Sequence, residues 1–212
     1  MKNFQVSNTP IYYIKNSVKN MIYLIGIDHL LQYNGPVPPE LLEEFKEYLV
    51  AMIKKLNITL IAEEFNEEFL RDVFNATEGT AEKAAEASGI SHLYCDPDAS
   101  EREALGIPYY ADVMDMVKER HSVREKFIMD RGLREEVERE TALEVKKFWP
   151  VRERFWLNKL KRRLDENILF LCGHEHVSGF SALLKEEGVP AAVIENFWRG
   201  DIFSDYGKLG LR

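Results

Sequence analysis

Two short segments of this chain place a histidine three residues after a glycine. They read Gly26-Ile27-Asp28-His29 and Gly173-His174-Glu175-His176. An imidazole transfers protons near neutral pH and binds transition metals, and a glycine lets the chain turn tightly without crowding a pocket. One such motif would be weak support for a site. Two of them, each directly after an apolar run, predict a functional role for His29 and His176.

A third apolar run ends in a carboxylate pair, Glu63-Glu64. The three runs have the composition of strands that are buried on both faces: Met21–Ile25, Ile58–Ala62 and Ile168–Cys172. If these strands are parallel in one sheet, their carboxyl ends share an edge, which is where open α/β sheets bind ligands. The pattern therefore predicts that both histidines and at least one of Glu63 and Glu64 converge on a single pocket.

The residues of that pocket allow more than one chemical role for each side chain. Side chains alternate along a strand, so one glutamate can line the pocket while the other caps a helix; alternatively, both mark an acidic helix start. Carboxylates near histidines ligate a divalent metal or hold a general base. We therefore expect His29, His176, Glu63 and Glu64 to serve as catalytic groups or metal ligands. His174 is either a further ligand or a residue packed against the sheet.

An arginine on a charged helix completes the set of candidates. Arg152 lies four residues before Trp156, on the same helical face, whereas Arg154 is separated from Arg152 by about 200° around a helix of 3.6 residues per turn. We predict that the Arg152 guanidinium points into the pocket, where it orients a carboxylate or stabilises an oxyanion. Arg154 should face solvent or a surface acid.

The order of the predicted elements indicates one α/β domain over residues 1–212. Strands alternate with helices, a pattern typical of a mostly parallel sheet of about five strands flanked by helices. The remaining strands are His92–Cys95 and Ala191–Ile194, and Ile11–Ile14 is a candidate edge strand. For the polar residues outside the motifs we favour structural roles. Asp96 and Asp98 are expected to form a turn and a helix cap. His92 and His121 are expected to have no functional role.

Residues 109–164 are strongly charged and helix-prone. We expect them to form a helical insertion that covers the strand ends, with a break at Gly132 and a helix start or kink at Pro150. Further helices are predicted from apolar periodicity and capping residues. The first follows a loop and helix start marked by Pro36, Pro38 and Pro39 and ends near Leu56. The others are 67–74, 80–88 with Thr80 as N-cap and Gly89 as its stop, a short helix from Ser100 with Glu103 in a capping box, and Val177–Glu187 before Gly188.

The composition of the chain argues against several classes of protein. A net charge of −8 over 212 residues argues against nucleic-acid binding. The first residues lack the apolar core of a signal peptide, and no apolar run reaches the roughly 18 residues needed to span a bilayer. Cys95 and Cys172 both fall in predicted buried strands, as expected of small hydrophobes in a reducing compartment. We expect a cytoplasmic protein that acts on a small molecule or peptide, with no membrane partner.

The residues above resemble the pattern of a known group, the TraB/Tiki superfamily with its erythromycin-esterase-like and ChaN-like relatives. That group carries two Gly-x-x-His motifs, a glutamate pair and one arginine. The matching positions are Gly26 with His29, Gly173 with His176, Glu63 with Glu64, and Arg152, in the same order along residues 21–194. The stretch that begins at Arg152 is similar to the group's arginine helix, and the stretch from Cys172 to Gly188 is similar to its final motif, helix and turn.

The resemblance implies an α/β core with inserted helices and a site at the strand ends. It also implies either hydrolysis, by metal-dependent peptide cleavage or ester cleavage, or iron or haem binding. The chain departs from the group in its short length, its lack of a membrane segment and its extra His174, and the first two argue against a membrane-tethered protease. The leading interpretation is a hydrolase of peptide, amide or ester bonds. The sequence leaves open whether this hydrolase uses a divalent metal, and which metal that is. The alternatives are an iron-, haem- or small-ligand-binding protein, and a degenerate member that makes only protein contacts.

Overall fold

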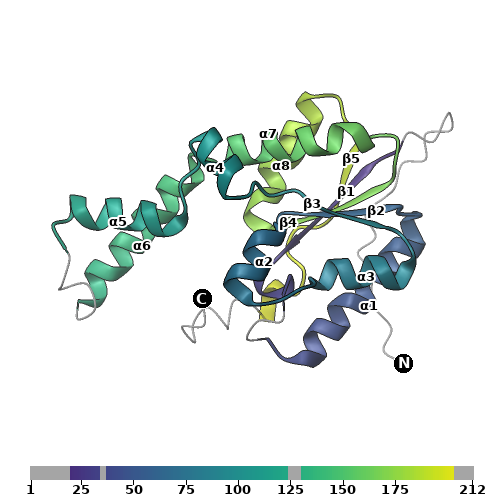
Figure 1. Cartoon of the computed structure of the whole chain (residues 1–212), viewed down its shortest axis with the longest axis horizontal. Helices are drawn as coiled ribbons and strands as arrows, with labels where there is room; N and C mark the ends of the chain where they lie inside the picture. The colour runs from purple at the N-terminus through teal and green to yellow at the C-terminus, as the bar shows by residue number, and fades with distance from the viewer. Residues whose placement is uncertain (1–19, 34–36, 124–129, 203–212) are drawn as a thin grey trace.

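The computed structural model describes residues 20–33, 37–123 and 130–202 (Figure 1). Its centre is a sheet of five parallel strands in the order β3-β2-β4-β1-β5. The strands are β1 (Ile22–Ile27), β2 (Leu60–Glu63), β3 (Ser91–Tyr94), β4 (Ile168–Gly173) and β5 (Ala191–Glu195). The predicted fold class is therefore confirmed, with every strand parallel. The candidate strand Ile11–Ile14 lies outside the described residues.

Helices cover both faces of the sheet (Figure 1). They are α1 (Pro39–Leu56), α2 (Glu67–Phe74), α3 (Thr80–Ser88), α4 (Ala99–Leu105), α5 (Tyr110–Arg120), α6 (Arg131–Lys146), α7 (Trp149–Leu160) and α8 (Val177–Glu186). Three short 3₁₀ turns each lie between a strand and a helix: η1 (His29–Leu31), η2 (Lys161–Arg163) and η3 (His174–His176). Helices α1 and α3 lie on one face, and α7 and α8 lie on the other.

Alternation along the strands divides the apolar side chains between two cores. Ile25, Ile61 and Leu169 pack toward α1 and α3. Their neighbours Leu24 and Phe170 pack toward α7 and α8, where Trp156, Phe180 and Leu184 are buried. Continuous apolar runs form strands here because both sides of each central strand are covered.

Two helix starts differ from the predictions. The N-cap of α3 is Gly79 rather than Thr80, while Gly89 ends this helix in the left-handed region at φ 66°. Helix α4 begins at Ala99 because the Asp98 carboxylate accepts a hydrogen bond from the Glu101 N–H, and Glu101 reaches back to the Asp98 N–H. The predicted box at Ser100 and Glu103 was wrong, since Asp98 caps equally well and comes first in the chain.

The described part of 109–164 is helical, as predicted, but it covers the strand ends only in part. Gly132 does not break a helix; it is the second residue of α6, which Asp130 caps. Pro150 lies in the first turn of α7 and begins a new helix. Helices α5 and α6 pack on each other around Val113, Val117 and Val137 and extend away from the sheet as an arm (Figure 1). Among the helices that the structure describes, none is both long and apolar enough to cross a bilayer.

Candidate functional site

The two Gly-x-x-His motifs leave the sheet side by side. Strands β1 and β4 are neighbours, and their register pairs Ile27 with Gly173. Each strand then passes directly into a 3₁₀ turn, with His29 at the start of η1 and His176 at the end of η3. The side chain of Asp28 caps η1 by accepting from the Leu30 N–H at 3.0 Å. Parallel pairing thus brings two motifs that are distant in sequence to one edge, as predicted.

Glu64 lies at the centre of the site. Its side chain is only 1% exposed, and its Oε2 accepts a hydrogen bond from the Gly173 N–H at 2.8 Å. Its Oε1 faces three nitrogen atoms: Arg152 Nη2 at 2.7 Å, His176 Nε2 at 3.5 Å and His29 Nε2 at 3.9 Å. Among the described residues Oε1 has no hydrogen-bond partner of good geometry, so charge dominates its interactions.

These neighbours keep Glu64 ionised. Burial alone would raise its pKa, because a carboxylate is poorly solvated inside a protein. The surrounding His176, Arg152 and His29 outweigh this effect, together with the N–H of Gly173, and lower the pKa of Glu64 to about 2. The floor of the site is therefore a buried negative charge.

Both imidazoles are held at Nδ1 and present Nε2 to this carboxylate. His29 Nδ1 lies 2.6 Å from Gln32 Oε1, and His176 Nδ1 lies 2.9 Å from Glu153 Oε1. His176 is buried between the rings of Trp149 and Trp156, with centroids 4.3 and 5.0 Å away. The side chain of His29 is 51% exposed. One histidine is therefore locked in place, and the other can meet solvent or a ligand.

Gly173 makes room for the histidine of the other motif. A Cβ at this position would lie 2.7 Å from His29 Nε2 and 3.4 Å from Glu64 Oε2. The glycine of the second motif is thus needed by the histidine of the first. Gly26 serves a different purpose, because a Cβ there would lie 2.0 Å from the backbone oxygen of Asn196.

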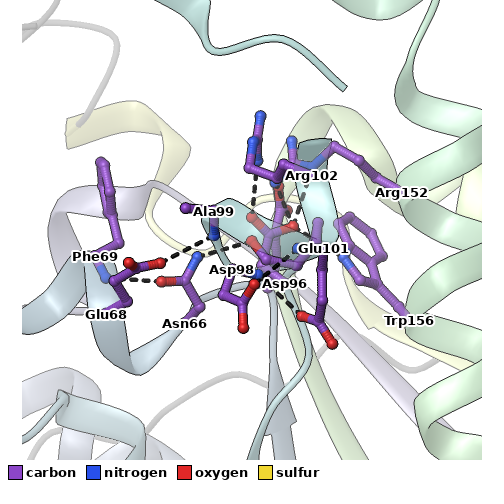
Figure 2. Close-up of polar contacts among 12 residues, drawn as sticks. Asn66, Glu68, Phe69, Asp96, Asp98, Ala99, Glu101, Arg102, Arg152 and Trp156 are labelled. Atoms are coloured by element: carbon purple, nitrogen blue, oxygen red, sulfur yellow. Dashed lines mark hydrogen bonds and ion pairs between the residues drawn. The ribbon is translucent and has the colours of Figure 1, made fainter. Parts of the chain in front are cut away.

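Arg152 lies in the site, and its second partner is Asp96 (Figure 2). Its Nε and Nη2 donate to Asp96 Oδ1 at 3.0 and 2.7 Å, and the indole Nε1 of Trp156 donates to the same oxygen at 3.1 Å. Arg102 contacts Asp96 Oδ2 at 3.3 Å. Burial would lower the pKa of Arg152, but Asp96 and Glu64 raise it above its ordinary value.

Arg154 faces the other way, as predicted. It forms an ion pair with Glu187, and its side chain is 44% exposed. The placement of both arginines is therefore confirmed. The interpretation of Asp96 as a plain turn residue was wrong: it follows β3 at the same sheet edge, and its carboxylate anchors Arg152.

Glu63 does not enter the pocket. It ends β2 on the α1/α3 face, where its Oε1 lies 2.8 Å from His92 Nε2 and its Oε2 accepts from Gln32 Nε2 at 2.7 Å. Alternation sends the two glutamates to opposite sides, and neither caps a helix, because Asn66 is the N-cap of α2. His92, expected to have no role, is the partner of a fully buried carboxylate.

A cavity of about 390 Å³ opens above Glu64, within the size range of small-molecule sites. Its floor includes Glu64, Arg152 and both motif histidines. Its helical wall comes from the base of the arm and the start of α7: Tyr110, Ala142, Val145, Lys146 and Trp149. His174 also lines it, with its ring stacked on Phe197 at a centroid distance of 3.8 Å. The packing interpretation of His174 is the one that this contact supports.

The sequence analysis missed Gln32 and Glu153 and gave Asp96 only a structural role. Asp96 carried a usable signal, because it follows a strand just as Glu64 does. Gln32 lies three residues after His29, within reach of one turn. Glu153 gave no signal, since a glutamate on a charged helix is usually solvated; it is buried because Gly179 leaves space beside it, where a Cβ would lie 2.7 Å from Glu153 Oε1.

The donor set fits a divalent metal poorly. His29, His176 and Glu64 converge, but the guanidinium of Arg152 lies 2.7 Å from Oε1, the glutamate oxygen that faces both imidazoles, and a fixed positive charge there repels a cation. Within residues 20–33, 37–123 and 130–202 no group of three or more His, Cys, Asp or Glu side chains has metal-holding geometry. Cys95 and Cys172 are free and buried, and burial raises the pKa of both thiols.

Comparisons of the chain with protein-family models, with curated proteins and with solved structures find no match. The functional interpretation therefore depends on the geometry of the site itself.

Proposed function

We propose that the chain is a hydrolase of the TraB/Tiki kind that cleaves an ester, amide or peptide bond in the pocket above Glu64. One observation carries this: two imidazoles, each held at Nδ1 by a side-chain oxygen, present Nε2 to one buried, ionised carboxylate. Oriented imidazole and carboxylate groups at a pocket floor suit general acid–base catalysis.

His29 is the proposed general base. The Nε2 of this half-exposed side chain takes a proton from water, and the resulting hydroxide adds to the substrate carbonyl. Glu64 Oε1, at 3.9 Å, stabilises the imidazolium that forms. The imidazolium then returns the proton to the leaving oxygen or nitrogen as the tetrahedral intermediate collapses.

The remaining groups prepare this step. Glu153 orients His176, which adds a second imidazole beside Glu64. Arg152 keeps Glu64 ionised and lines the pocket, where its charge favours an oxyanion. Because Arg152 is shared by Glu64 and Asp96, its effect on an oxyanion is smaller than that of an unpaired guanidinium. No step in this scheme passes through a metal.

We extend the proposal to the cellular compartment of the protein and to the molecules that it binds. Two free, buried cysteines suit a reducing compartment such as the cytoplasm. A net charge of −8 disfavours nucleic acid as a substrate. A pocket of this volume accepts a small molecule or a short part of a peptide.

A panel of chromogenic esters, anilides and short peptides tests the proposal. His29→Gln should lower turnover of any accepted substrate by about 10²- to 10⁴-fold, the usual contribution of general base catalysis. His121→Gln is the matched control, because His121 pairs with Glu140 within the arm. Equal activity of the two variants would refute the role of His29.

A second candidate function is ligand binding without turnover, including iron or haem. The observation that favours it is Glu64 Oε1, a buried oxygen without a hydrogen bond that faces two Nε2 atoms. Because Arg152 Nη2 lies 2.7 Å from the same oxygen, a small organic ligand fits this alternative better than iron or haem does. Metal analysis and an absorption spectrum of protein purified without chelator test it. Stoichiometric iron or a Soret band that disappears in His29→Gln would favour binding over hydrolysis.

A further inference from the structure

We propose that Gln32 is a positioning residue that fixes the proton of His29 on Nδ1, and that buried Glu63 holds Gln32 in the orientation this requires. The juxtaposition is a hydrogen-bonded series, His92–Glu63–Gln32–His29, that runs from the α1/α3 face of the sheet to the pocket. Its catalytic consequence rests on the proposed function, but its effect on His29 does not.

The orientation of the Gln32 amide follows from its partners. Gln32 is 1% exposed, and its Nε2 donates to Glu63 Oε2 at 2.7 Å and to the Glu64 carbonyl oxygen at 3.1 Å. Rotating the amide by half a turn would set its oxygen against these two acceptors. The Oε1 of Gln32 must therefore face His29 Nδ1, 2.6 Å away.

This orientation decides the tautomer of His29. An amide oxygen only accepts hydrogen bonds, so Nδ1 of His29 carries the proton and Nε2 keeps its lone pair. Free imidazole side chains prefer the opposite tautomer, with the proton on Nε2. The series therefore works against the intrinsic preference and leaves the basic nitrogen facing Glu64 and the pocket.

Glu63 and His92 anchor the series from the far face. Glu63 is fully buried and its Oε1 lies 2.8 Å from His92 Nε2, while the side chain of His92 is 10% exposed. Both carboxylate oxygens of Glu63 are thus engaged by side chains. A buried carboxylate that accepts from Gln32 is what stops the amide from turning over.

Nitrogen NMR of the histidine side chains in the wild-type protein tests the tautomer directly. The five histidines are assigned by single substitution, and spectra are recorded at about pH 8, where an ordinary imidazole is neutral. His29 should show a protonated Nδ1 and an unprotonated Nε2. A His29 with its proton mainly on Nε2 overturns the proposal, whether or not the protein proves to be a hydrolase.

Variants separate positioning from simple structural support. Gln32→Leu should return His29 to the Nε2-protonated form, and Glu63→Gln should give a mixture of the two forms. Tyr94→Phe is the matched control: it removes the hydroxyl that donates to Glu82 at 2.8 Å, on the same face as Glu63, and keeps the ring that packs on His92. A His29 tautomer that stays unchanged in both Gln32→Leu and Glu63→Gln overturns the role of Gln32.

Turnover supplies a second readout once a substrate is known. In metal sites, replacing the residue that orients a ligating histidine typically costs about 10- to 100-fold in activity, and Gln32 holds His29 in the same way. We therefore expect Gln32→Leu to lower kcat by about that factor with little change in KM, and Tyr94→Phe to leave kcat within about twofold. If no substrate is found, hydrolysis fails as the proposed function, while the wild-type spectrum still decides the tautomer.

Discussion

The two motif glycines should respond very differently to the same substitution. At Gly26 a Cβ would lie 2.0 Å from the Asn196 backbone oxygen and 2.7 Å from a methyl group of Val177. At Gly173 the closest atom would be His29 Nε2 at 2.7 Å, which belongs to a half-exposed side chain. Neither glycine has a positive φ, so alanine meets no backbone strain at either position.

The magnitudes follow from what must move. In Gly26→Ala the carbonyl of Asn196 has to withdraw from 2.0 Å to at least 3.4 Å, which displaces the chain after β5. Overpacking of this kind costs about 3 kcal/mol or more when the backbone is the obstacle. In Gly173→Ala the His29 ring can swing toward solvent, at a cost of about 1 kcal/mol. The stiffer unfolded chain offsets roughly 0.4–1 kcal/mol of it.

Stability and function should therefore separate. Gly26→Ala should lower Tm by about 6–12 °C, since 1 kcal/mol is roughly 2–4 °C for a chain of this size. Gly173→Ala should remain within about 3 °C of the wild type but lose at least tenfold in turnover, because a displacement of about 1 Å at a reacting group is costly.

Thermal and urea unfolding measure the first difference, and the hydrolase assay or the NMR signal of His29 measures the second. Similar losses of stability in the two variants would refute the assignment of Gly26 to packing and Gly173 to the site. An unchanged His29 signal in Gly173→Ala would refute the close approach of the two motifs.

Three further experiments test the charged groups of the site. Arg152→Lys should cost about 3 kcal/mol in urea unfolding, as expected for a damaged buried ion pair, while Arg154→Lys should stay within about 0.5 kcal/mol; equal losses would contradict their placement. The pKa of Glu64 is lowered from 4.5 to about 2, so its ionised form stabilises the fold above pH 4.5 and this contribution fades as the pH falls toward 2. The difference in unfolding free energy between the wild type and Glu64→Gln should therefore shrink over that range, and a constant difference would be inconsistent with the lowered pKa. Glu153→Ala leaves the buried Nδ1 of His176 without an acceptor and should cost about 1–3 kcal/mol in thermal unfolding; Glu153→Gln, which keeps an acceptor oxygen, should recover most of that loss.

Much of the fold could be predicted from the sequence, because the patterns that determine its strands and helices lie within short segments. The uninterrupted apolar runs predicted β1 and β4; β4 is buried along its whole length, and β1 is buried at every residue except Tyr23. Helical periodicity predicted α1 with its end near Leu56, and the prolines at 36, 38 and 39 marked its start, which the structure places at Pro39. The spacing between Arg152 and Arg154 predicted that their side chains diverge, since the angle between side chains on a helix is set by the backbone alone. Trp156, on the face of Arg152, and the resemblance to a known helix favoured Arg152 as the inward residue.

Other features depended on distant parts of the chain. Alternation said that Glu63 and Glu64 diverge, but only the packing of α1 and α3 on one face and α7 and α8 on the other decided that Glu64 is the site residue. The helicity of α5 and α6 was predictable, whereas their direction away from the sheet depends on which faces find partners.

The sequence by itself determined the strand-end motifs and the chemistry that they offer. Hydrophobic pattern and residue type are properties of short segments, and they placed His29, His176 and Arg152 near one edge. The tertiary structure alone decided the environment of those groups. Asp96 meets Arg152 across 56 residues, Gln32 meets Glu63 across 31, and Glu153 meets His176 across 23. Such contacts arise when the sheet order β3-β2-β4-β1-β5 brings distant strand ends together, and buried charge and hydrogen bonding, rather than local propensity, then select the partners.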